Sequence, residues 1–261
     1  MSSRRIIKQL IYGALYLLVL LGVGFLIYQA TLKPAPSCTD GKKNQDETGI
    51  DCGGSCQDCA INTLKELTAS GAIAIPAQDS ERSSIYISLE NPNASYGATE
   101  VNIEVTVERK SGAALNLSEQ TFIYPSERKG VLIPNISVAA SDIVSISAVV
   151  TERQWQPIES FARPKYEVRN QEVVVVDESE LKPRIILTGL LRNENAQTLR
   201  SAEIIARYRD ANDAVVAVSQ TQLESIAGFE EESFELITPV SPAVLQNIVL
   251  EPILDVEIQT R

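Results

Sequence analysis

The chain has 261 residues, of which 44% are hydrophobic and 5% aromatic, a length that accommodates one large domain or two small ones. Its 34 acidic and 23 basic residues give a formal net charge of -11, which argues against a nucleic-acid partner because nucleic-acid binders need clustered positive charge. Histidine is absent, so serine–histidine and cysteine–histidine nucleophile pairs, histidine metal centres and histidine proton shuttles are excluded.

An apolar segment near the N-terminus, Leu10 to Tyr28, carries no charge over 19 residues. A helix rises about 1.5 Å per residue, so the segment spans roughly 28 Å, close to the ~30 Å hydrocarbon core of a bilayer. It predicts a transmembrane helix over residues 10–28, through which the chain contacts the membrane. The alternative is a cleaved signal peptide, whose apolar core usually runs about 7–15 residues. Because this core is longer and Tyr28 is bulky, we expect an uncleaved signal-anchor.

The flanking charges predict the orientation of this helix. Arg4, Arg5 and Lys8 in residues 1–9 favour a cytoplasmic N-terminal tail. Three lysines follow the helix within about 15 residues, so the bias from charge alone is weak. We expect a single-pass protein of the plasma membrane whose C-terminal domains are extracytoplasmic.

The next segment, residues 29–60, contains all four cysteines of the chain: Cys38, Cys52, Cys56 and Cys59. Outside the cytoplasm they are expected to form two disulfides, and three pairings are open. A segment this short buries too little apolar area to fold without such staples. In the cytosol the four thiols would instead suit zinc, but thirteen, three and two residues separate successive cysteines, unlike the paired CxxC…CxxC of a zinc ribbon.

Five oxygen-bearing residues inside this segment form a candidate calcium site: Asp40, Asn44, Asp46, Glu47 and Asp51. Carboxylate and amide oxygens are the ligands that calcium prefers, although the spacing is not that of an EF-hand. The alternative is that they are ordinary polar residues of tight turns. No other metal or cofactor is expected.

The same segment resembles a small module of the form C-x-DG-x-x-N-x-x-E-x-x-x-DCGG-x-C-x-x-C, which recurs beside the anchors of bacterial and archaeal surface proteins. The matching residues are Cys38, Asp40, Gly41, Asn44, Glu47, Asp51, Cys52, Gly53, Gly54, Cys56 and Cys59. The resemblance implies an exported segment and a prokaryotic source, and it implies no enzyme activity.

From about residue 61 the pattern changes to strands. Residues 101–108 alternate apolar and polar side chains, which is typical of a half-buried strand. The signals occur twice, about 101–103 residues apart: residues 71–75 match 172–176, 89–93 match 191–195, and 125–131 match 228–234. We therefore predict a mainly β protein with two tandem immunoglobulin-like β-sandwiches, residues 61–165 and 166–261, each with about seven strands. The only tryptophan, Trp155, is interpreted as a partly buried sandwich residue.

The second half resembles the FxLYD domain, a sandwich of bacterial membrane-anchored proteins. The resemblance rests on Gly189, Asn193, the segments 206–210 and 214–216, and Gly228 before Phe234. Ala206, Tyr208 and Arg209 stand where phenylalanine, leucine and tyrosine are expected, while Asp210 is kept. The first half is similar to the water-stress, late-embryogenesis-abundant type 2 sandwich, whose mark is the Asn-Pro-Asn of residues 91–93. Neither resemblance implies a catalytic site.

No catalytic motif of the G-x-S-x-G, P-loop or G-x-G-x-x-G type occurs. The acidic runs at 230–232 and 177–180 are predicted to be solvated loops rather than paired catalytic carboxylates. The layout predicts a non-enzymatic membrane-anchored protein with a binding, adhesion or envelope-scaffolding role, and with a protein or cell-envelope partner. The alternative is a calcium- or redox-responsive regulatory membrane protein that acts through the acidic cysteine-rich segment.

Overall fold

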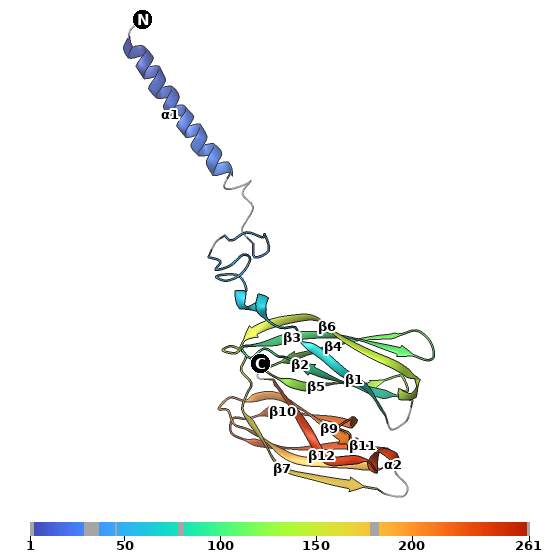
Figure 1. The fold of residues 1–261 in the computed structure, drawn as a ribbon. Helices are drawn as coiled ribbons and strands as arrows, with labels where there is room; N and C mark the ends of the chain where they lie inside the picture. The colour runs from blue at the N-terminus through green and yellow to red at the C-terminus, as the bar shows by residue number, and fades with distance from the viewer. Residues whose placement is uncertain (1–2, 29–36, 45, 78–80, 178–182, 260–261) are drawn as a thin grey trace. The chain divides into compact units, whose positions relative to one another are not determined.

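The structure is a computed structural model, and it describes residues 3–28, 37–44, 46–77, 81–177 and 183–259 (Figure 1). The chain divides into two compact units, Met1–Leu64 and Lys65–Arg261. The first contains the apolar helix and the cysteine-rich segment, and the second contains all the strands. The prediction of a mainly β protein with an N-terminal helix is confirmed.

The first element is the helix α1 (Ser3–Ile27). It begins before the predicted start at Leu10 because arginine and lysine are good helix formers, so the basic tail continues the helix. Its end lies next to the predicted end at Tyr28. The stretch Ile7–Ile27 is long and apolar enough to cross a membrane, and none of it is buried against other parts of the chain.

The cysteine-rich segment has little regular structure. Its one short helix is the 3-10 helix η2 (Cys59–Thr63), which runs across the predicted boundary at residue 60. The Asp58 side chain begins η2 by accepting a hydrogen bond from the amide of Ala60. A single β-bridge joins Gly49 to Cys52.

The first sandwich has six strands among its described residues, in two antiparallel sheets. One sheet has the order β1-β2-β5 and the other β4-β3-β6. The bounds are β1 (Thr68–Pro76), β2 (Ser83–Glu90), β3 (Tyr96–Arg109), β4 (Leu115–Ile123), β5 (Arg128–Ile136) and β6 (Ile143–Pro157), with the 3-10 helix η3 (Ala140–Asp142) before β6.

The second sandwich repeats this arrangement, with one sheet β7-β8-β11 and the other β10-β9-β12. Its elements are β7 (Tyr166–Val176), β8 (Arg184–Asn193), β9 (Leu199–Asp210), β10 (Val215–Ile226), β11 (Glu231–Pro239), the short helix α2 (Pro242–Leu245) and β12 (Ile248–Gln259). The expectation of about seven strands in each half is wrong by one. In the first sandwich, the long strands β3 and β6 continue through bulges instead of ending there. Each therefore includes residues that could otherwise have formed a further strand.

Each sandwich encloses its own apolar core, because alternate side chains of its strands point inward. The alternation predicted for residues 101–108 is confirmed: Val101, Ile103, Val105 and Val107 are all buried in the first core. Trp155 is partly buried and packs against that core, as interpreted from the sequence.

A buried asparagine follows or ends the second strand of each sandwich. In the first sandwich, the Asn91 side-chain amide donates hydrogen bonds to the carbonyls of Tyr96 and Tyr124, at 2.7 and 3.0 Å. Its side-chain oxygen accepts from both the backbone and the side chain of Asn93, each at 3.0 Å. Tyr96 begins β3 and Tyr124 follows β4, so Asn91 ties one sheet to the other.

Asn193 makes the same kind of contact in the second sandwich. Its amide donates to the carbonyls of Gln197, Ile226 and Ala227 at 2.8, 3.1 and 3.0 Å. Its oxygen accepts from the backbone and side chain of Asn195 at 2.9 and 2.8 Å.

The next asparagine along is also equivalent in the two halves. Asn93 exchanges two hydrogen bonds with the backbone of Lys65, and Asn195 exchanges two with the backbone of Lys165. Each pair joins the strand-ending turn to the chain that enters the sandwich. The predicted match between residues 89–93 and 191–195 therefore holds at the level of individual hydrogen bonds.

The predicted match between residues 71–75 and 172–176 is wrong by two positions. Ile73 pairs with Tyr86, and Glu172 pairs with Thr188, so the first strands are equivalent at a separation of 99 residues. The second strands are equivalent at a separation of 102, as Asn91 and Asn193 show. The connection between the first two strands is longer in the second half, and a two-residue error left the alternation unchanged and hence undetected.

We predict that Asn91→Ala and Asn193→Ala each lower the free energy of unfolding by about 2–4 kcal/mol, because each leaves two or three buried carbonyls without a donor. Chemical denaturation of the full chain in detergent measures the change. Asn116→Ala is the control, since Asn116 is exposed on β4, and its cost should be within about 0.5 kcal/mol. Equal costs at Asn91 and Asn116 would contradict the structural role.

Candidate functional site

The four cysteines form two disulfides in the structure, Cys38–Cys56 and Cys52–Cys59. This selects one of the three pairings that the sequence left open. The first bond closes a loop over the acidic residues, and the second closes the short segment that leads into η2. Among the described residues of this unit, the only buried side chains are Cys52 and Glu47, so covalent bonds rather than an apolar core hold the segment together.

Two neighbouring glycines make this crossing of the chain feasible. Gly53 and Gly54 adopt left-handed φ angles of +82° and +61°. A Cβ on Gly53 would lie 1.9 Å from the Thr48 hydroxyl oxygen, and a Cβ on Gly54 would lie 2.4 Å from the Asp46 carbonyl oxygen. The Gly-Gly pair is therefore required by space as well as by backbone conformation.

The five candidate calcium ligands are engaged in the turns of this segment. Asp51 accepts from the Gly41 amide, Asp40 from the Lys42 amide and the Asn44 side chain, and Glu47 from the Asn44 amide. Asp46 accepts from the Ser55 hydroxyl, and this hydrogen bond is the main reason that the pKa of Asp46 is lowered.

Among the described residues, no three histidine, cysteine, aspartate or glutamate side chains lie close enough together to hold a metal ion. The hydrogen bonds of the carboxylates are of the kind that polar turn residues make. Calcium binding by the five residues stays a prediction.

A second cluster of functional groups, which the sequence analysis missed, lies where the two sandwiches meet within the unit Lys65–Arg261. Lys129 on β5 forms an ion pair of 2.7 Å with Glu257 on β12. The Lys129 side chain is only 4% exposed and that of Glu257 13%. Thr121 on β4 accepts from the Lys129 ammonium at 2.7 Å and donates to Glu257 at 3.0 Å. We call this group, together with the charged residues around it, the junction. Its residues are Glu119, Thr121, Glu127, Lys129, Arg163, Glu203, Arg207, Asp255 and Glu257.

The junction continues along β12. Asp255 accepts from the backbone amide of Gly130 at 3.1 Å and pairs with Arg207 on β9 at 2.8 Å. Arg207 in turn lies over the ring of the buried Tyr86 on β2. A Cβ at position 130 would lie 2.5 Å from the Tyr86 ring, so Gly130 permits this close approach.

Side chains of the first sandwich and the linker also reach the backbone of β12. The Tyr124 hydroxyl donates to the carbonyl of Ile258 at 2.8 Å, and Arg163 donates to the carbonyl of Val256 at 3.0 Å. Arg163 also pairs with the buried Glu127 at 3.1 Å. Burial raises the pKa of Tyr124, so its hydroxyl stays protonated as a donor.

The junction contains more carboxylates than cations. Glu203 on β9 is the direct cross-strand partner of Glu257 on β12. Burial raises the pKa of Glu203, and Glu257 and Glu119 raise it further while Lys129 opposes them. Burial and Glu257 likewise raise the pKa of Glu119 on β4. Burial also raises the pKa of Asp255, despite the nearby Arg207.

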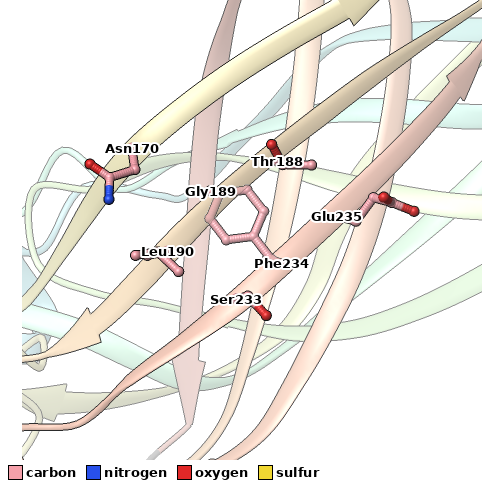
Figure 2. Close-up of a pocket in the computed structure, with 7 residues that line it drawn as sticks. All are labelled: Asn170, Thr188, Gly189, Leu190, Ser233, Phe234 and Glu235. Atoms are coloured by element: carbon pink, nitrogen blue, oxygen red, sulfur yellow. The ribbon is translucent and has the colours of Figure 1, made fainter.

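Two hollows on the surface of the described residues are candidates for a ligand site. A shallow depression of about 530 Å³ lies on the sheet β7-β8-β11, where the Phe234 ring packs into the space beside Gly189 (Figure 2). Glu235 is its only charged lining residue. The other hollow, of about 660 Å³, lies between the two sandwiches, beside the start of α2, and its lining includes Arg82. Among the described contacts, no lining hydroxyl of either hollow is hydrogen-bonded to a carboxylate, as an activated nucleophile would be.

The described residues of the two acidic runs are exposed, although their placement in loops is partly wrong. Glu231 and Glu232 belong to the start of β11 rather than to a loop, because the ladder with β8 begins at Glu231. Of residues 177–180, only Asp177 lies within the described residues, and it is exposed.

Two Ser-x-x-Lys sequences occur, residues 126–129 and 179–182, and the second lies outside the described residues. In the first, Ser126 lies in the turn before β5, with a left-handed φ of 54°. The ammonium of Lys129 is taken up by Glu257 and Thr121. The pair therefore lacks the arrangement of a serine nucleophile with its lysine base.

Comparison with known proteins gives no family: no protein-family model matches the chain, and no curated protein is significantly similar to it.

We predict that peptide mapping under non-reducing conditions finds Cys38–Cys56 and Cys52–Cys59. Cleavage before aspartate leaves Cys52 and Cys56 on one peptide, with Cys38 and Cys59 on two others. Fragmentation between Cys52 and Cys56 in the mass spectrometer then shows which partner each one carries. Cys38 attached to Cys52 or to Cys59 would contradict the structure.

Proposed function

We propose that this chain is a non-enzymatic, single-pass membrane protein whose cysteine-rich module and two sandwiches lie outside the cytoplasm, where the sandwiches serve in binding, adhesion or envelope scaffolding. The observation that carries the proposal is the combination of α1 with the two disulfides. An apolar helix that buries nothing in its own chain needs a bilayer, and disulfides persist in oxidising compartments.

The charge distribution supports the same arrangement. All three charged residues before Leu10 are basic, which leaves 20 basic and 34 acidic residues in the remainder of the chain. Basic residues favour the cytoplasmic side of a membrane helix, whereas a strongly acidic domain is repelled by anionic lipid and nucleic acid. The acidic part is thus suited to project from a membrane.

The sandwiches support a binding or scaffolding role more than catalysis. Their strand order, repeated in both halves, shares three pairs with an immunoglobulin-like sandwich, first with second, second with fifth and third with sixth, while the fourth strand lies beside the third. Such folds commonly present surfaces and loops to partners, and function has to be argued from a site rather than from the fold. The described residues offer polar contacts that hold the two sandwiches together, and the two hollows carry no catalytic arrangement. The resemblances to FxLYD and water-stress domains are consistent with this role.

We predict that an impermeant thiol reagent labels the cysteines of intact cells only after a reductant is added. We also predict that protease added to intact cells removes the sandwiches, and that mass spectrometry of the native polypeptide finds the first thirty residues present. Labelling without reduction, or protected sandwiches, would place the module in the cytosol. Loss of the first thirty residues would show that α1 is a cleaved signal peptide.

A redox-responsive role for residues 38–59 is the second candidate function. It is favoured by the dependence of this segment on its disulfides, since it has almost no buried side chains of its own. Reduction is expected to unfold the module and to raise its sensitivity to protease, while calcium is expected to release no measurable heat because the carboxylates already bind the turns. Limited proteolysis of the full chain with and without reductant, and calorimetry with millimolar calcium, test these outcomes. Unchanged protease sensitivity of the reduced module would end the redox hypothesis.

A further inference from the structure

The junction brings three carboxylates to one ammonium. Glu257 on β12 is held by Lys129 on β5, and Glu203 lies directly opposite Glu257 in the antiparallel pair of β9 and β12. Glu119 lies on the same face of β4 as Thr121, which donates to Glu257. Like charges directly opposite each other destabilise a sheet, and here both carboxylates are partly buried, which strengthens the repulsion.

The neighbouring charges do not supply the missing cation. Arg207 on β9 forms an ion pair with Asp255 on β12, and Arg163 in the linker forms an ion pair with Glu127. Among the described residues, the charged groups linked by contacts in this region come from β4, β5, β9, β12, the turn before β5 and the linker. They are five carboxylates and three cations: Glu119, Glu127, Glu203, Asp255 and Glu257 against Lys129, Arg163 and Arg207. The imbalance is concentrated at Glu119 and Glu203, neither of which has an ion-pair partner among the described contacts.

We propose that the junction is an acid-strengthened joint: protonation of Glu119 and Glu203 removes the repulsion around Glu257, so that the two sandwiches dock more firmly in mildly acidic than in alkaline solution. The Lys129–Glu257 pair remains intact in both states and fixes the docked arrangement. The pH therefore regulates how often the two sandwiches separate, and with it the stiffness of the double sandwich. The proposal rests on contacts within residues 65–261 and does not depend on the membrane topology proposed above.

The direction follows from proton linkage. The pKa values of Glu119 and Glu203 are raised above the ordinary glutamate value of 4.5 when the sandwiches are docked, so the docked form binds more protons than the undocked form. Stability of the junction is therefore lowest above the raised pKa values and increases as the pH falls through them toward 4.5. Asp255 shifts in the same direction, since its pKa is also raised.

The test is hydrogen exchange of the full chain in detergent, followed by mass spectrometry and corrected for the intrinsic effect of pH on exchange. The junction segments are residues 119–131 and 253–258, and the reference segment is residues 101–108 in the first core. Between about pH 8 and about pH 5.5, we expect protection of the junction segments to rise about three- to tenfold relative to the reference.

Glu119→Gln combined with Glu203→Gln is expected to show this higher protection already at about pH 8 and to lose most of the pH dependence. The matched control is Glu152→Gln together with Glu235→Gln, two exposed glutamates on strands outside the junction and the reference segment, which should behave as the original chain. Flat or falling protection of the original chain on acidification would overturn the proposal, as would lower protection of the double glutamine variant at about pH 8.

Lys129→Met supplies a second, independent measurement. Removal of the cation that pairs with Glu257 is expected to lower protection of the junction at about pH 8 by more than tenfold and to make its pH dependence steeper, because the unpaired carboxylates then take up protons on docking. Unchanged protection and an unchanged pH dependence in this variant would show that the charges of the junction do not govern docking, and would also overturn the proposal.

Discussion

The need to satisfy buried carbonyl groups where a strand leaves one sheet for the other is the constraint on which both sandwiches depend. A buried carbonyl without a hydrogen-bond donor lowers the free energy of unfolding by about 1–3 kcal/mol. Asn91 and Asn193 meet this need with short side chains that carry two donors and an acceptor. The turn between the second and third strands is fixed by them, and the pairing of the third strand follows from that turn.

The same requirement extends to the meeting of the two sandwiches. The edge of a sheet exposes unpaired backbone groups that invite pairing with other chains. In β12 the carbonyls of Val256 and Ile258 are instead taken by Arg163 and Tyr124. Side chains rather than a continued ladder protect this edge, so the sandwiches remain two cores joined by polar contacts. An interface of this kind is sensitive to charge in a way that an apolar core is not.

The sequence predicts features that repeat with a short period or depend on composition, and it fails for contacts between distant residues. The apolar helix, the strand from Val101 and the equivalence of Asn91 with Asn193 follow from local patterns. The disulfide pairing does not, because all three pairings are compatible with the same spacing. The junction was missed since Lys129 and Glu257 are far apart in the chain, and each resembles an ordinary surface residue. A signal was available, however. Lys129 alternates along β5 with the buried Val131 and Ile133, so its side chain lies on the inward face, which is unusual for lysine.

The two parts of the chain use opposite means to hold acidic residues in place. In the cysteine-rich module, the carboxylate of Asp46 accepts a hydrogen bond from the Ser55 hydroxyl in an exposed turn, and this bond lowers the pKa of Asp46. At the junction, burial disfavours the ionised form of Glu119 and Glu203. On acidification, Glu119 and Glu203 at the junction therefore take up protons before Asp46 does. Within one strongly acidic chain, the response to acid is thus set by burial and not by the number of acidic residues.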